Sequence, residues 1–228
     1  AAPLFCLHPA GGFSWPFVRL RRHIGAQHPI YGIESPDLAA AGGPGAPPPA
    51  SLEELARLYA ERIRRVRPRG PYHLAGWSFG GAVAHAVACL LEEQGEQVAL
   101  LALLDAFVPG WKGEQTQAAS APPGTVQGAQ GAVAAAVAAE YGDPGLPAAN
   151  HRLAARLWAA AGRAGMRRFG GAAVVFAAKD APEGAAQAWE PHIAGRIEYH
   201  AVPATHMELL DAAGAAVIGP VLAERMAR

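Results

Sequence analysis

The stretch GWSFGG, residues 76–81, constrains this chain more than any other part of its sequence. It lies between an apolar run, PYHLAGW, that predicts a strand and residues 80–93, which predict a helix closed by Gly95. Glycines two residues before and two after Ser78 leave room for a strained, tight strand-to-helix turn. Such a turn exposes the serine hydroxyl, so the pattern predicts a nucleophile at Ser78.

Two other interpretations of this stretch are a glycine-rich turn that only packs closely and a nucleotide-binding loop. The residues match neither G-x-G-x-x-G nor the Walker pattern, which also needs a lysine. A helix that starts right after Ser78 also aims its first amide N–H groups at the site where an oxyanion would form. We therefore expect catalysis at this turn.

Apolar strands alternate with helices around this motif. Strands are expected at residues 3–8, 28–34, 71–77, 98–105, 172–178 and 196–202. Ser51 and Glu54 form a capping box for a helix that Pro68 stops, and an Ala-rich helix through Val217 and Leu222 closes the chain. Strand, helix and strand in succession imply parallel pairing. The pattern predicts an α/β fold with a mostly parallel central sheet flanked by helices.

Residues 109–165 break this regular alternation, and we expect a helical or irregular lid insertion there. Within it, the sequence suggests an Ala-rich helix at 133–140 and a helix capped by Asn150 that runs through Trp158. The length of 228 residues and a hydrophobic fraction of 51% suit one domain, 1–228, with one core. Because the chain lacks an initiator Met and starts almost at once with a strand, we expect a piece of a larger protein or a trimmed chain.

Charge argues against two classes of partner. Nineteen basic residues balance nineteen acidic ones, so we expect no nucleic-acid partner and no membrane partner. A basic cluster at the end of the helix after Ser51 is either a solvated face, favoured by the helix dipole, or a docking patch for an acidic partner. Its members are Arg62, Arg64, Arg65, Arg67 and Arg69.

The two cysteines, Cys6 and Cys89, fall inside apolar segments without metal-ligand spacing. We interpret them as small buried hydrophobic residues and expect neither a disulfide nor a metal site. A reducing, cytoplasmic location fits this usage. The sequence also lacks a signal-peptide pattern and an apolar run of about 18 residues.

A serine nucleophile of this kind needs an acid and a histidine, which follow it in the chain in that order. Asp105 ends the apolar strand 98–105, at the carboxyl edge where ligands bind in open parallel sheets. The other interpretation of Asp105 is a helix cap or turn residue.

The best candidate for the base is His206, which lies between the last strand and the closing helix. His192 is its only serious rival. Three other histidines lie within a predicted strand or helix and are better interpreted as structural or surface residues: His73, His85 and His200.

The loop after the first strand, HPAGG at residues 8–12, should supply part of an oxyanion hole. The backbone N–H groups of Ala10 and Phe79 would form the donor pair, and each such donor is typically worth about 10²–10³ in rate. The other interpretation of HPAGG is a simple turn, since proline and glycine form turns in any case.

Four stretches together resemble the terminal (type I) thioesterase domains of nonribosomal peptide synthetases, which belong to the α/β-hydrolase superfamily. They are FCLHPAGG, GPYHLAGWSFGG, LLEEQGEQVALLALLD and VPATHMELLD. The resemblance covers nearly the whole chain except the lid. The chain departs from the family at Ala204 and Thr205, where the family often has Gly and then Asp or Asn before its histidine.

This resemblance implies that Ser78 is the nucleophile, Asp105 the acid and His206 the base. It also implies that Ala10 and Phe79 form the oxyanion hole, and that the substrate arrives on the phosphopantetheine arm of a peptidyl carrier protein domain. The domain itself would bind no cofactor and would be monomeric. The acyl-serine would then be released by hydrolysis or by macrocyclisation.

Two alternatives stay open at this point. A free-standing editing thioesterase or a general esterase would use the same residues on shorter acyl groups, and a non-catalytic relative would serve as a binding module. Trp111, Trp158 and Trp189 are candidates for the lining of an apolar substrate pocket, although such aromatic residues also pack in cores and lid hinges.

Overall fold

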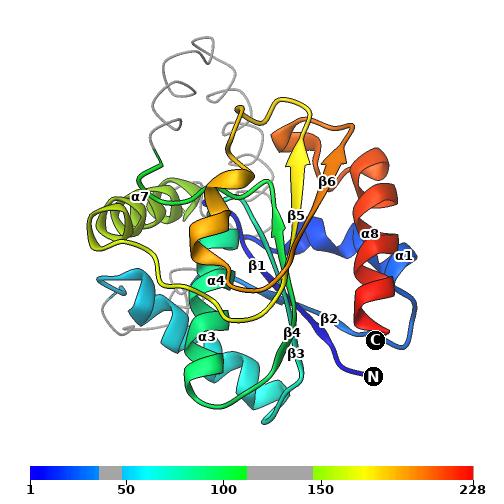
Figure 1. The fold of residues 1–228 in the computed structure, drawn as a ribbon, viewed down its shortest axis with the longest axis horizontal. Coiled ribbons are helices and arrows are strands. Elements are labelled where there is room, and N and C mark those ends of the chain that lie inside the picture. Colours follow the sequence, from blue (N-terminus) through cyan, green and yellow to red (C-terminus); the bar gives the residue numbers. More distant parts are fainter. Residues whose placement is uncertain (36–47, 112–145, 228) are drawn as a thin grey trace.

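The computed structural model describes residues 1–35, 48–111 and 146–227, and its centre is a six-stranded sheet (Figure 1). The strand order is β2-β1-β3-β4-β5-β6, and the five strand pairings are parallel. The strands are β1 (Leu4–Leu7), β2 (Ile30–Ile33), β3 (Tyr72–Trp77), β4 (Val98–Leu104), β5 (Ala173–Ala178) and β6 (Ile197–Val202). The α-helices are α1 (Arg21–Ile24), α3 (Leu52–Val66), α4 (Phe79–Glu93), α7 (Leu146–Ala164) and α8 (Ala212–Met226). Short 3₁₀ helices are η1 (Trp15–Leu20), η2 (Gln187–His192) and η3 (His206–Glu208).

All six predicted strands and their parallel pairing are confirmed, as are the helices after Ser51 and after the GWSFGG motif. Helix α4 starts at Phe79, one residue earlier than predicted, and ends where Gly95 adopts a φ of +78°. The segment from η1 to α1 was not predicted as helical. It is built of short turns, and Ser14 before it makes no side-chain cap. Its two helix signals, Pro16 near the start of η1 and Gly25 after α1, are residues that also form turns.

Of the predicted lid, residues 109–111 and 146–165 belong to the described part of the chain. Residues 112–145, which include the helix suggested at 133–140, lie outside the described residues. Helix α7 occupies the end of the predicted insertion but begins at Leu146, so the prediction that Asn150 caps it is wrong. Asn150 lies inside the helix, and its side chain binds a loop elsewhere in the chain.

Side chains alternate along each central strand between two hydrophobic cores. Leu101 and Leu103 of β4 face the core under α3, α4 and α7, whereas Leu100, Ala102 and Leu104 face the core under η1, α1 and α8. Figure 1 shows these two groups of helices on opposite faces of the sheet. Burying one such leucine contributes about 1.5–3 kcal/mol. The continuously apolar sequence of β4 is therefore explained by burial on both faces.

The strand order places a topological switch point between β1 and β3. After β1 the chain crosses to η1 and α1 on one face, whereas after β3 it crosses to α4 on the other face. The register pairs Leu7 with Gly76, so both strands end at the same level. Loops that diverge in this way open a crevice at the carboxyl ends of the strands, where ligands bind in open α/β sheets.

Three of the five arginines in the basic cluster are held by protein groups. Arg62 donates to the Glu34 carbonyl at 3.0 Å, and Arg67 donates to the Pro71 carbonyl at 3.1 Å. Arg64 pairs with Glu96 at 3.5 Å. These contacts tie the end of α3 to neighbouring loops, so the cluster is more than a solvated face.

Both cysteines lie buried in the cores, as predicted. Burial raises the pKa of the Cys6 thiol and raises that of Cys89 to about 11, which suppresses thiolate formation. Among the described residues, no helix has the length and apolar character needed to cross a membrane.

Three buried histidines should make the fold sensitive to acid. Burial lowers the pKa of His8, His73 and His85 from 6.5 to about 4, because a charged ring loses its hydration. The unfolded chain binds these protons as the pH falls below about 6.5 while the folded chain does not, so the free energy of unfolding declines through that window. We expect Tm, followed by circular dichroism, to fall between pH 6.5 and pH 4.

The variant His73→Phe tests the cause, since it removes one of the three groups and keeps a ring of similar size. Its Tm should decline less steeply over the same pH window than that of the wild type. A wild-type Tm that stays constant from pH 6.5 to pH 4 would contradict the prediction.

Candidate active site

The turn between β3 and α4 has a strained backbone. Ser78 adopts φ 57° and ψ −125°, a conformation that costs a non-glycine residue on the order of 1–3 kcal/mol. Its N–H donates to the Leu104 carbonyl at 3.0 Å, which anchors the turn to the neighbouring strand. A Cβ atom at Gly76 would lie 2.1 Å from the Gly80 carbonyl oxygen, so the tight turn requires glycine there.

Gly80 lets α4 start directly against the end of β1. A Cβ atom there would lie 2.4 Å from the carbonyl oxygens of both Leu7 and His8. At Gly81 it would lie 2.1 Å from the Cβ of Ala106, in the segment after β4. The glycines that the sequence singled out are thus explained by close packing against two neighbouring segments.

Asp105 and His206 are in contact across the sheet edge. The His206 Nδ1 atom lies 2.6 Å from the Asp105 Oδ2 atom, although 101 positions separate the two residues in the chain. The other carboxylate oxygen of Asp105 accepts the Ala178 N–H at 3.0 Å, and its backbone N–H donates to the Phe176 carbonyl at 2.7 Å. The carboxylate is nearly buried, at 4% exposure, so these bonds fix its orientation toward the imidazole.

His206 opens η3 and is held from several sides. Its backbone N–H donates to Asp180 Oδ1 at 2.8 Å, and its ring lies 5.8 Å from the Trp77 ring and 5.9 Å from the Phe107 ring. Thr205 caps η3 through a capping box with Glu208. Sequence reasoning did not single out Asp180, which reaches His206 only because β5 and β6 are neighbours.

The rival base, His192, lies elsewhere. Its carbonyl accepts a hydrogen bond from His85 at 3.0 Å, and its ring meets the Trp189 ring edge-on at a centroid distance of 6.4 Å. The histidine brought to Asp105 is therefore His206.

The HPAGG loop and the start of α4 lie side by side. The loop forms a turn closed by the Gly12 N–H, which donates to the Pro9 carbonyl at 2.9 Å. The His8 ring lies 6.1 Å from the ring of Phe79. Phe79 is the first residue of α4, and an N–H in that position has no acceptor within its own helix.

A family model described as a thioesterase domain matches residues 2–223. The chain belongs to the thioesterase domain family.

Similar proteins include parts of peptide synthetases. The chain is 30% identical to the probable non-canonical nonribosomal peptide synthetase CymA of Salinispora arenicola, over 98% of this chain and 3% of that protein. It is 31% identical to enterobactin synthase component F of Escherichia coli O157:H7, over 96% of this chain and 17% of that protein. The chain spans only 1–4% of the length of three other synthetases that it matches over about half of its residues.

A solved structure confirms the fold of the thioesterase domain. The RedJ thioesterase from the prodiginine biosynthetic pathway in Streptomyces coelicolor is similar with a TM-score of 0.75 at 21% identity, over 98% of this chain and 86% of that chain. This likeness confirms the α/β-hydrolase fold that the sequence predicted.

Helix α7 of the thioesterase domain packs against both candidate oxyanion segments. The Asn150 Nδ2 atom donates to the Gly11 carbonyl at 3.0 Å, inside the HPAGG loop. Two turns further along α7, the half-buried Trp158 ring lies 6.2 Å from the ring of Phe79. The described part of the predicted lid thus touches the loop after β1 and the start of α4.

The other two tryptophans that the sequence analysis named as pocket candidates are Trp111 and Trp189. Trp111 is half-buried and packs at the edge of the core under α4. Trp189 is fully buried, and its indole N–H donates to the Ala106 carbonyl at 2.8 Å. The structure therefore places it in the core and not in the lining of a pocket, where the sequence analysis had placed it as a candidate. Its size and apolar surface made it a candidate, but the same properties suit it to the core.

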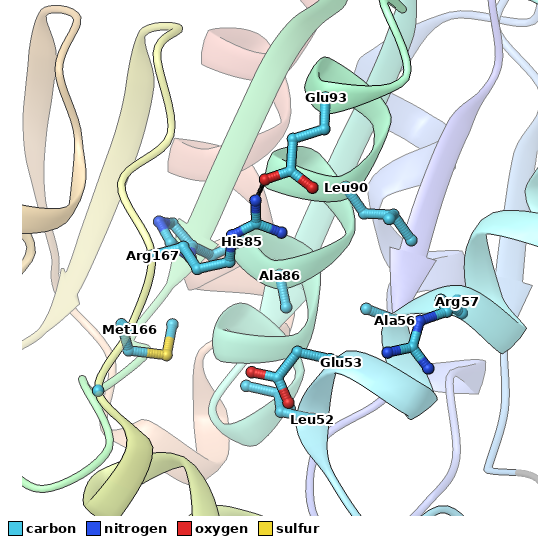
Figure 2. Close-up of a pocket in the computed structure, with 11 residues that line it drawn as sticks. Leu52, Glu53, Ala56, Arg57, His85, Ala86, Leu90, Glu93, Met166 and Arg167 are labelled. Atoms are coloured by element: carbon cyan, nitrogen blue, oxygen red, sulfur yellow. Dashed lines mark ion pairs between the residues drawn. The ribbon is translucent and has the colours of Figure 1, made fainter.

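A cavity of about 170 Å³ lies between α3, α4 and the segment after α7 (Figure 2). Figure 2 shows the ion pair between Glu93 and Arg167 at its edge, and Met166 also lines it. It contains none of the candidate catalytic residues. We interpret it as a packing gap where α7 ends.

Gly80→Ala should disable the site with a limited cost in stability. The new methyl group would push the start of α4 away from the Leu7 and His8 carbonyls, and overpacking of this kind costs about 1–3 kcal/mol. We expect the rate of labelling of Ser78 by a fluorophosphonate to fall at least about tenfold, part of the 10²–10³ that one oxyanion donor supplies.

Gly95→Ala is the matched control. A Cβ atom there meets nothing within 4 Å, and the positive φ alone costs about 1 kcal/mol. This variant should be labelled at the wild-type rate. Equal labelling of Gly80→Ala and wild type would contradict the steric role of Gly80.

Proposed function

We propose that this thioesterase domain releases a peptidyl or acyl chain from the phosphopantetheine thioester of a carrier domain through an acyl ester on Ser78. The observation that carries the proposal is the 2.6 Å contact between His206 and Asp105. It supports the acid and base predicted for Ser78. Ser78 and Asp105 follow adjacent strands at one sheet edge, because Trp77 pairs with Leu104.

The proposed reaction uses these side chains in fixed roles. Asp105 holds the Nδ1–H of His206, which leaves Nε2 as the base that takes the proton of the Ser78 hydroxyl. The serine oxygen attacks the thioester carbonyl carbon and forms a C–O bond, while the carbonyl oxygen becomes an oxyanion. When this intermediate collapses, the C–S bond breaks and the thiol leaves with the proton from His206.

The oxyanion would be met by the N–H groups of Ala10 and Phe79. The packing of the HPAGG loop against the start of α4 supports this pair, because Gly80 brings the two backbones into contact. The positive end of α4 points to the same place. In the second half of the reaction, attack of water on the acyl ester releases a free acid, whereas attack of a nucleophile within the acyl group releases a macrocycle. In both cases the oxygen of Ser78 is the leaving group.

A carrier domain as partner is supported by the relatives, which are synthetases many times longer than this chain. The carrier would present the acyl group on its own phosphopantetheine arm, so the thioesterase domain would bind no cofactor. Arg65 and Arg69 of the basic cluster stay exposed and suit an acidic partner surface.

Helix α7 supports an acyl group that contains peptide bonds. We assign α7, in the described part of the predicted lid, to the border of the site, with Trp158 and Trp111 as lining residues. Among the described residues, the Trp158 Nε1 atom of this helix is buried without a hydrogen-bond partner. An unpaired donor on the helix is the complement of a peptide C=O.

Ser78→Ala should abolish acyl-enzyme formation and leave Tm close to the wild-type value, because the change removes only a hydroxyl and keeps the turn. Mass spectrometry after incubation with a fluorophosphonate checks the first half, and thermal melting checks the second. No adduct on Ser78 in a folded wild-type sample would contradict the proposal and favour a non-catalytic binding module.

A second experiment separates peptide release from general ester hydrolysis. We expect kcat/KM for a carrier-bound peptidyl thioester to exceed that for p-nitrophenyl acetate by at least about 100-fold, since contacts remote from the reacting bond lower the barrier. Comparable values for the two substrates would instead indicate an editing thioesterase or a general esterase.

A further inference from the structure

The geometry of the Pro9–Ala10 peptide links the proposed oxyanion donor to the rest of the fold. The carbonyl of Pro9 and the N–H of Ala10 belong to one planar peptide group, and in a trans peptide the two point in opposite directions. Whatever holds the Pro9 carbonyl therefore sets the direction of the Ala10 N–H. Two donors hold it: the Gly12 N–H at 2.9 Å and the His8 Nδ1 atom at 2.6 Å.

The first chain of hydrogen bonds reaches the Pro9 carbonyl through the His8 ring. A carbonyl oxygen can only accept, so His8 Nδ1 must carry a proton. Burial lowers the pKa of the ring to about 4, so the ring is neutral at physiological pH and Nε2 is an acceptor. The Tyr59 hydroxyl, 2.5 Å from Nε2, is then the donor. Tyr59 belongs to α3 and is fully buried.

The second chain of hydrogen bonds reaches the Pro9 carbonyl from α7. Asn150 Nδ2 donates to the carbonyl of Gly11. That carbonyl shares a peptide group with the N–H of Gly12, which donates to the Pro9 carbonyl. Each accepted bond polarises the peptide group and strengthens the bond that its N–H donates.

We propose that Tyr59, acting through His8, and Asn150, acting through Gly11 and Gly12, are positioning residues that aim and polarise the Ala10 N–H toward the oxyanion. The inference rests on the proposed role of Ala10. It assigns functions to three residues that sequence reasoning did not single out for catalysis. It also makes the oxyanion hole depend on α7 being seated over the loop.

The test uses two variants that remove one donor each and keep side-chain shape. Tyr59→Phe removes the hydroxyl beside His8, and Asn150→Leu removes the donor to Gly11. We expect each to lower kcat on a peptidyl pantetheine thioester roughly tenfold, part of the 10²–10³ that one oxyanion donor supplies. KM should change less than about twofold, since the oxyanion forms only in the transition state.

Stability separates positioning from a purely structural role. Asn150→Leu should change Tm little, because the lost bond to the half-buried Gly11 carbonyl is offset by removal of the unpaired, buried Asn150 Oδ1. Tyr72→Phe is the matched control for Tyr59→Phe. Tyr72 is also fully buried, and its hydroxyl donates to the Arg67 carbonyl at 3.1 Å, at the opposite end of β3 from Ser78. Its kcat should equal that of the wild type.

Two His8 variants separate the contacts of the ring. His8→Asn places an amide N–H near the Nδ1 position and should restore much of the kcat that His8→Leu loses. The double variant Tyr59→Phe/Asn150→Leu should lose less than the product of the single losses, because both chains act on one peptide group.

These outcomes distinguish failure of the positioning role from failure of the proposed function. An inactive wild type without labelling of Ser78 overturns both. An active wild type overturns the inference alone if Tyr59→Phe and Asn150→Leu retain kcat within about twofold, or if Tyr72→Phe loses as much kcat as Tyr59→Phe.

Discussion

The close approach of two backbones, at the start of α4 and the end of β1, is the constraint on which the site depends. Gly80 has no room for a side chain because the Leu7 and His8 carbonyls lie against it. This contact fixes the strained Ser78 turn beside the HPAGG loop, at the point where the chain crosses to opposite faces of the sheet. The parallel register of β1 and β3 makes the contact possible, since Leu7 and Gly76 end their strands at one level.

Hydrogen bonds then orient the side chains of the proposed catalytic residues. Asp105 binds the main chain of β5 and the imidazole of His206 through different oxygens, so its orientation is decided by the sheet. On the other side of the turn, the neutral His8 ring accepts a hydrogen bond from the Tyr59 hydroxyl and donates one to the Pro9 carbonyl. In both histidines a hydrogen-bonded neighbour fixes which ring nitrogen carries the proton: Asp105 for His206 and the Pro9 carbonyl for His8.

Helix α7, in the described part of the predicted lid, belongs to the same arrangement. Asn150 and Trp158 lie on one face of the helix, eight positions apart, and contact the two segments proposed to form the oxyanion hole. A helix that bonds to the proposed oxyanion loop can couple its own seating to the orientation of the proposed donors. The acyl chain and the machinery that attacks it would then be organised by the same helix.

The sequence alone determined the alternation of strands and helices, the parallel sheet and the identities of Ser78, Asp105 and His206 as candidates. These follow from local signals: apolar runs, glycines around a serine, and chain order. Tertiary structure alone decided that His206 and not His192 meets Asp105, and that Trp189 belongs to the core. It also decided the roles of Tyr59 and Asn150, whose bonds to the HPAGG loop span 51 and 139 positions. Contacts over such distances leave no periodic or local pattern in the sequence, because only the packed sheet brings their elements together.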